Sequence, residues 1–137
     1  MRRRTFLAGV ALAAVGTRAR AQTGATRTQI DLALAAASLA ALRARYGESY
    51  PDVVAARTRI TSLRASLEQA RAGGEAIDVA LVTSALEGEL ADVNARLGEF
   101  SARCGSGHPD METARARAAA LADAIAHVTS DGVFLAH

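Results

Sequence analysis

Tryptophan is absent from this 137-residue chain, aromatic residues make up 4% of it, and it holds one cysteine and two prolines. Half of the residues are apolar, so the core must be built from Ala, Leu, Val and Ile. With so little proline, this composition favours helix over strand at nearly every position. The single cysteine, Cys104, excludes an intramolecular disulfide and a cysteine-rich metal store. We expect a buried apolar role for it, the alternatives being an intermolecular disulfide and a reactive thiol.

Catalytic and cofactor motifs are also missing from the sequence. It contains no Gly-rich phosphate loop, no Ser-His-Asp arrangement with positional support, and no His and carboxylate motif at helical metal spacing. We therefore predict no catalytic residues, no cofactor and no enzymatic activity.

Residues 1–21 have the three parts of an export signal. Arg2, Arg3 and Arg4 form a basic start, an apolar run covers residues 6–16, and a small-x-small pattern ends at Ala21. Cleavage after Ala21 would give a mature chain of residues 22–137. The apolar run is shorter than the roughly 20 residues that a membrane-spanning helix needs, so we expect no permanent anchor. These features predict a soluble protein of the bacterial periplasm.

The signal also resembles the twin-arginine type. Arg3 and Arg4 precede Phe6 and Leu7 at the spacing of that motif. The resemblance implies export of an already folded protein, and the general secretory route is the alternative. Short helical hairpins fold quickly, which suits export in the folded state.

Removal of the signal reverses the sign of the net charge. The full chain has 16 basic residues, all Arg, against 14 acidic ones. Five of those Arg residues lie within residues 1–21, which leaves 11 against 14 and a net charge of −3 in residues 22–137. Binding to a nucleic-acid backbone needs a clustered positive surplus, so we expect no nucleic-acid partner.

The apolar spacing, close to seven residues per two turns, predicts an all-α fold of four helices. Their expected ranges are 27–46, 51–71, 76–103 and 109–129. Gly47 and Gly105 can adopt the left-handed conformation that ends a helix. Pro51 and Pro109 suit the first turn of the next helix, where Asp52 and Asp110 place negative charge. The connections are short, so neighbouring helices should be antiparallel within one domain.

The two halves of this domain are related in sequence. A shift of 58 residues aligns residues 39–67 with 97–125 at ten identities in 29 positions, including an Arg-x-Gly-x-x-x-Pro-Asp framework. We interpret residues 27–71 and 76–129 as a duplicated antiparallel helical hairpin, forming either a four-helix bundle or two extended coiled-coil hairpins. The two Gly-x-x-x-Pro-Asp tips should lie at the same end of the molecule.

The first tip carries a family resemblance. Residues 42–57 read LRARYGESYPDVVAAR, and this string resembles the coiled-coil hairpins of bacterial exopolysaccharide chain-length determinants, the polysaccharide co-polymerases. The resemblance implies a place in the cell envelope and a link to polysaccharide export.

The tips are also where polar groups could converge. His108, Asp110 and Asp52 are the candidate metal or small-ligand residues, with helix capping and solvation as the expected role. Arg57, Arg59, Arg115 and Arg117 should be solvated or paired with Glu87, Glu89 and Glu99. His127 should interact with the dipole of the last helix, while His137 shares no motif with His108.

Residues 130–137 form a short tail after that helix. Its apolar residues, 133–135, should fold back onto the bundle, with partner docking as the alternative.

Taken together, these patterns predict a non-enzymatic periplasmic interaction or spacer protein of the bacterial envelope. It would act through its helix faces, by binding a protein partner or by self-association. The alternative is a periplasmic four-helix protein that binds a small ligand or a metal.

Overall fold

The computed structural model describes residues 24–105 and 107–136 of the chain, apart from the side chain of Cys104. Within these ranges the protein has four helices and no strand, in the order α2 (Ala25–Arg43), α3 (Pro51–Ala72), α4 (Val79–Cys104) and α5 (Pro109–Asp131). The all-α prediction is confirmed. The predicted export signal, Ser106 and His137 lie outside the described residues.

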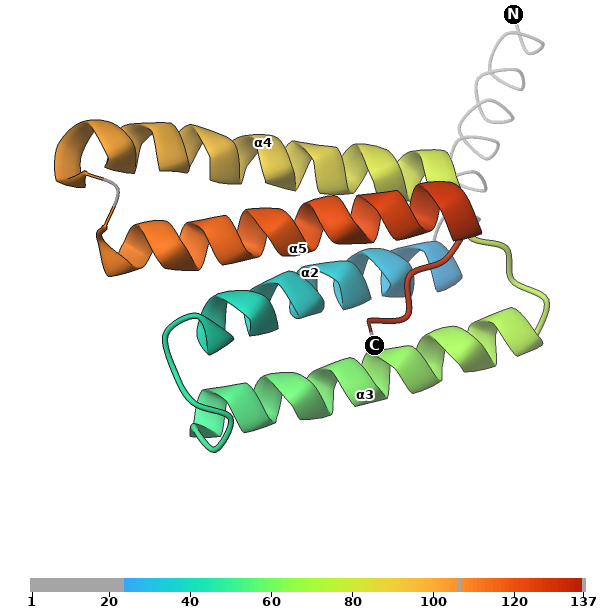
Figure 1. The fold of residues 1–137 in the computed structure, drawn as a ribbon. Coiled ribbons are helices and arrows are strands. Elements are labelled where there is room, and N and C mark those ends of the chain that lie inside the picture. The colour runs from blue at the N-terminus through green and yellow to red at the C-terminus, as the bar shows by residue number, and fades with distance from the viewer. Residues whose placement is uncertain (1–23, 106, 137) are drawn as a thin grey trace, which may run out of the picture.

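Helix α2 lies at the centre of the molecule (Figure 1). It packs against α3, α4 and α5, and α4 packs against α5. Among the described helices, α3 packs against α2 alone. The architecture is therefore a three-helix bundle of α2, α4 and α5 with α3 attached to its outside. The two predicted hairpins are present, and they share a packed interface through α2.

Two clusters of buried side chains hold this arrangement together. Helix α2 supplies Ala33 and Ala37 to the cluster shared with α4 and α5, and Leu32 and Leu39 to the cluster shared with α3. Alanine allows close approach of the helix backbones, which suits the side of α2 that meets two helices. The apolar spacing on which the helix prediction rests runs through Leu32 and Leu39 and does not contain Ala33 and Ala37.

The helix boundaries differ from the expected ones in several places. Helix α2 ends at Arg43, three residues earlier than expected, and Gly47 is not among the residues with positive φ. Gly105 has φ 73° and ψ 175°, which is outside the left-handed helical region. The left-handed cap is Gly132, with φ 76° and ψ −6° at the end of α5. Beyond the end of α2, the Tyr46 ring stacks on that of Tyr50, with ring centroids 4.0 Å apart.

The start of α4 also differs from the expected residue 76. Asp78 caps this helix by accepting a hydrogen bond from the backbone N–H of Leu81, so the first helical residue is Val79. The backbone N–H of Asp78 in turn donates to Thr26 Oγ1 on α2 at 3.0 Å. This contact fastens the α3–α4 connection to the beginning of α2.

None of α2 to α5 is both long enough and apolar enough to cross a bilayer.

Candidate functional site

A groove runs between α3 and α5, with α2 as its floor. It encloses about 670 Å³. Ala36, Leu39, Ala40 and Arg43 line it from α2, Arg57, Ile60, Thr61 and Arg64 from α3, Ala120, Asp123 and His127 from α5, and Phe134, Leu135 and Ala136 from the tail. The floor is apolar except for Arg43 at the end of α2, and the walls carry the other charged groups.

The groove exists because α3 is attached along a single stripe. Val53, Ile60 and Leu67, spaced seven residues apart, are the buried residues of α3 and pack on the leucine side of α2. Seven residues are two turns of a helix, so the three side chains form one narrow line. In the described structure α3 does not pack against α5, and the space between these two helices stays open except where the tail lies in it.

The C-terminal tail closes one end of the groove. Residues 133–136 leave α5 and run across α2 toward α3 (Figure 1). The Gln29 side chain, fully buried on α2, exchanges two hydrogen bonds of 2.9 Å with the backbone N–H and C=O of Phe134. Arg64 on α3 donates from Nε to the carbonyl of Leu135 at 2.7 Å and from Nη2 to the carbonyl of Ala136. The expectation that the tail folds back is confirmed.

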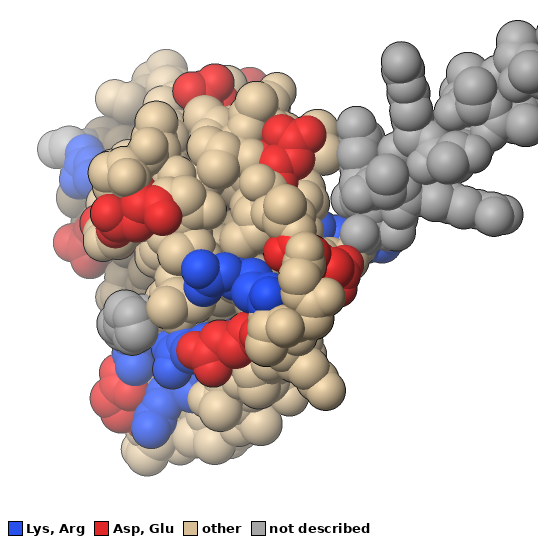
Figure 2. Space-filling model, turned by 90° about the vertical axis from the view of Figure 1, so that its right-hand side faces the viewer, with Lys and Arg blue, Asp and Glu red and all other residues tan. Residues whose placement is uncertain are grey.

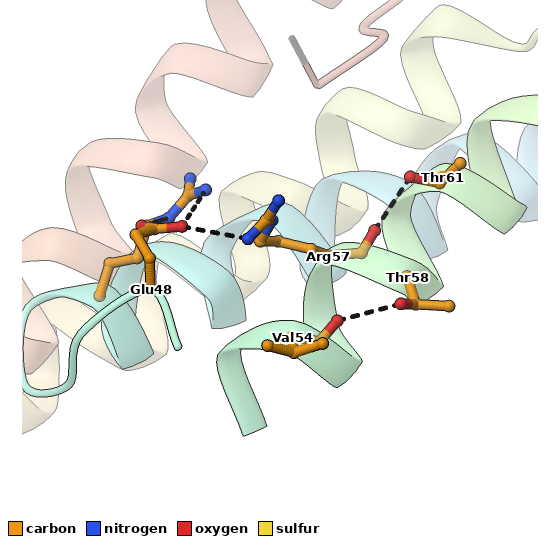
Figure 3. A network of polar contacts seen from close by, with 6 residues as sticks. Glu48, Val54, Arg57, Thr58 and Thr61 are labelled. Carbon is orange, nitrogen blue, oxygen red and sulfur yellow. Dashed lines mark hydrogen bonds and ion pairs between the residues drawn. The ribbon is translucent and has the colours of Figure 1, made fainter. Parts of the chain in front are cut away.

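At the other end, a carboxylate lies between two guanidinium groups. Glu48 accepts hydrogen bonds from Arg43 at 2.6 and 3.2 Å, and its second oxygen lies 3.6 Å from Arg57 (Figure 3). The hydrogen bond from Arg43, followed by the charges of both arginines, lowers the pKa of Glu48 below its usual value. Because one carboxylate serves two arginines, this cluster keeps a surplus positive charge.

The α5 wall carries a histidine and an aspartate one turn apart. His127 Nδ1 lies 2.9 Å from the carbonyl oxygen of Asp123 and 3.5 Å from its carboxylate. The backbone contact with Asp123, and then its negative charge, raise the pKa of His127 above the ordinary value. The imidazole of His127 is therefore protonated more readily than that of a free histidine. His127 thus lies in the last part of α5, as expected, and its direct partner is Asp123.

The tip residues singled out in the sequence lie at one end of the molecule, on the two neighbouring tips. Arg45 on the first tip and Asp110 on the second are 3.5 Å apart. His108 Nδ1 accepts the backbone N–H of Asp110 at 3.2 Å and so caps α5, as expected of a capping residue. Asp52 lies in the first turn of α3, as Asp110 does in α5.

These tip residues do not assemble a metal site in the described part of the chain. No three or more His, Cys, Asp or Glu residues come close enough there to share an ion.

The two tips have the same local geometry. Pro51 and Pro109 are the first residues of their helices, and the preceding residues, Tyr50 and His108, have nearly the same extended backbone angles. The equivalence of the two tips follows the repeat found in the sequence.

The repeated arginines have different partners. Arg117 lies 3.5 Å from Glu89, which is one of the ion pairs expected from the sequence, whereas Arg57 lies close to Glu48.

Acidic and basic side chains are interspersed on the end of the molecule shown in Figure 2. Charge is therefore mixed over that end and does not form a patch of one sign.

Sequence reasoning missed the groove, its lining residue Arg64, and Gln29, which binds the tail at the closed end. A glutamine inside an apolar stretch of α2 was the available signal, since a buried amide requires a partner. Comparison with known proteins adds no further residue: no family model, curated protein or solved structure matches this chain.

Proposed function

We propose that this chain is a non-enzymatic helical interaction protein of the bacterial cell envelope, and that it binds a segment of another envelope protein in the groove between α3 and α5. One observation carries the proposal: α3 packs on α2 alone among the described helices and leaves an apolar floor open beside it. Grooves lined by helices are a recurrent site for peptide recognition.

The chemistry of the groove suits binding. Its apolar floor, which includes Leu39 and Ile60, can exclude water from a bound segment, and its charged walls can set the orientation of that segment. The cellular setting rests on the export features of residues 1–21. The tip motif adds polysaccharide export as the first system in which to search for the partner.

Site-specific photocrosslinking in the bacterial envelope tests this proposal. The full chain would carry a photoreactive phenylalanine at Thr61 in the groove or, as the control, at Ser84 on the exposed side of α4. We expect one discrete adduct from the Thr61 position and none from Ser84. An adduct with the mass of two copies would show self-association instead. Equal adduct patterns from both positions would contradict the proposal.

A further inference from the structure

The chain's own tail shows what kind of group occupies the space between α3 and α5. We infer that the open part of the groove takes an extended, apolar peptide segment of a partner protein, with a carboxylate that binds Arg57. This inference rests on the proposed function of the groove and specifies the chemistry of its partner.

The first argument is the way in which the tail fills the closed end. Val133 and Leu135 pack into the cluster between α2 and α3, whereas Phe134 packs into the cluster of α2, α4 and α5. Such alternation is typical of an extended segment, whose successive side chains point to opposite sides. Backbone groups of this segment are bound by Gln29 and Arg64. An extended peptide with apolar side chains thus already fits between these helices.

The second argument is that the open part repeats this chemistry. Arg57 precedes Arg64 by seven residues, which is two turns or about 10.5 Å along α3, so both lie on one face of the helix. Both side chains line the groove, and the buried Ile60 lies between them in the chain. A peptide that continues the path of the tail would therefore meet a second guanidinium group over an apolar floor.

The third argument is charge. Among the described residues that line the groove, three are arginines, namely Arg43, Arg57 and Arg64, and Asp123 is acidic. Glu48 lies beside Arg43 and Arg57 and compensates one of their two charges. Arg64 is bound to neutral carbonyl groups. The described part of the site keeps an excess of positive charge. A carboxylate is therefore the side chain that fits, and a guanidinium can bind it through two hydrogen bonds.

A titration with two matched peptides tests the inference. The probes are acetyl-Val-Phe-Leu-Ala-Asp-amide and the same peptide with Asn in place of Asp, added to the isotope-labelled chain and followed by amide NMR shifts. We expect the acidic peptide to shift resonances of Ala40, Ile60 and Thr61, and to bind about tenfold or more tightly than the Asn peptide.

Two variants of α3 supply the matched controls. R57Q should weaken the acidic peptide about tenfold and leave the Asn peptide unchanged. R59Q removes the same charge from the other flank of α3, where Arg59 lines a separate hollow with Asp31 and Ala56, and should leave both affinities unchanged. Thermal unfolding would verify that both variants are folded. R57K should recover part of the affinity, since it restores the charge without the planar guanidinium.

Several results would overturn the inference. Equal binding of the two peptides, binding of neither, or shifts confined to the residues around Phe134 would each do so. Tighter binding of decanoate than of the acidic peptide would identify an acyl ligand instead. If Thr61 crosslinks a protein in the envelope while the two peptides bind equally, the proposed function stands and the inference fails. If the acidic peptide binds as expected and Thr61 crosslinks nothing, the proposed function fails.

Discussion

The side chain of Gln29 holds the backbone of Phe134 at two points. Its amide nitrogen donates to the Phe134 carbonyl and its amide oxygen accepts the Phe134 N–H, each at 2.9 Å. The two residues are 105 positions apart, and both are buried. This pair fastens the tail to the first described helix and so defines the closed end of the groove.

Replacing Gln29 with Ala should lower the free energy of unfolding by about 2 to 4 kcal/mol, because it leaves a buried N–H and a buried C=O without partners. Urea unfolding followed by circular dichroism measures this change. Gln69→Ala on the exposed side of α3 is the matched control, and should change stability by less than about 0.5 kcal/mol. Similar midpoints for the two variants would show that the Gln29 contacts contribute little.

Helix α3 should open more readily than the rest of the fold, since α2 is its one helical neighbour in the described structure. We expect the amides of Ile60 and Leu67 to exchange with deuterium at least about tenfold faster than those of Leu32 and Leu121. Arg64→Gln, which removes the contacts with the tail, should accelerate exchange in α3 and leave α4 unchanged. Uniform exchange across the four helices would mean that α3 is held more firmly than its packing indicates.

Replacing Gly132 or Gly88 with alanine should change the stability of the fold in opposite directions. Gly132 has φ 76° in the left-handed cap of α5, so Gly132→Ala should destabilise the fold by about 1 to 2 kcal/mol. Gly88 lies within α4, and a Cβ added there would meet no atom within 4 Å, so Gly88→Ala should stabilise the fold by about 0.5 to 1 kcal/mol. Thermal unfolding of both variants gives the two signs. A gain in stability for Gly132→Ala would be inconsistent with the observed cap.

The charge on His127 should depend on Asp123. The pKa of His127 is raised in the folded protein, so its contribution to stability is present at pH below about 6.5 and is lost as the pH rises through the folded pKa. Asp123→Asn keeps the backbone carbonyl and removes the carboxylate, and should lower the pKa of His127 part of the way. NMR titration of the imidazole measures this, with Asp92→Asn on α4 as control. An unchanged pKa in Asp123→Asn would exclude the carboxylate as a cause.

The sequence carried enough information for the helices and tips because these depend on local chemistry. Proline is tolerated in the first turn of a helix and not in its interior, so Pro51 and Pro109 mark helix starts. The adjacent aspartates are favourable at a helix N-terminus in any fold. The groove, by contrast, depends on which helices become neighbours. Four amphipathic helices can close into a bundle or stay open, and the apolar spacing of α3 is compatible with both.

The hydrogen-bond partners of Gln29 and Arg64 could not be predicted from the sequence either. Gln29 bonds to a residue 105 positions away, and Arg64 to backbone carbonyls 71 and 72 positions away. No local sequence pattern predicts that the backbone carbonyls of the tail accept hydrogen bonds from Arg64. The polar tip residues were the candidates for a ligand site, as the alternative to helix capping, because their motif is repeated. The groove has no such motif, and most of its lining consists of ordinary Ala, Leu and Arg residues.

The most direct test of the central claim combines photocrosslinking at Thr61 with a substitution that fills the groove. Ala40 lines the floor on α2 and is partly exposed, so Ala40→Phe should occupy the space that a partner segment would take. If the groove is the binding site, this substitution removes the Thr61 adduct while the protein stays folded by circular dichroism. A folded Ala40→Phe variant that still gives the same adduct at the same yield would contradict the claim.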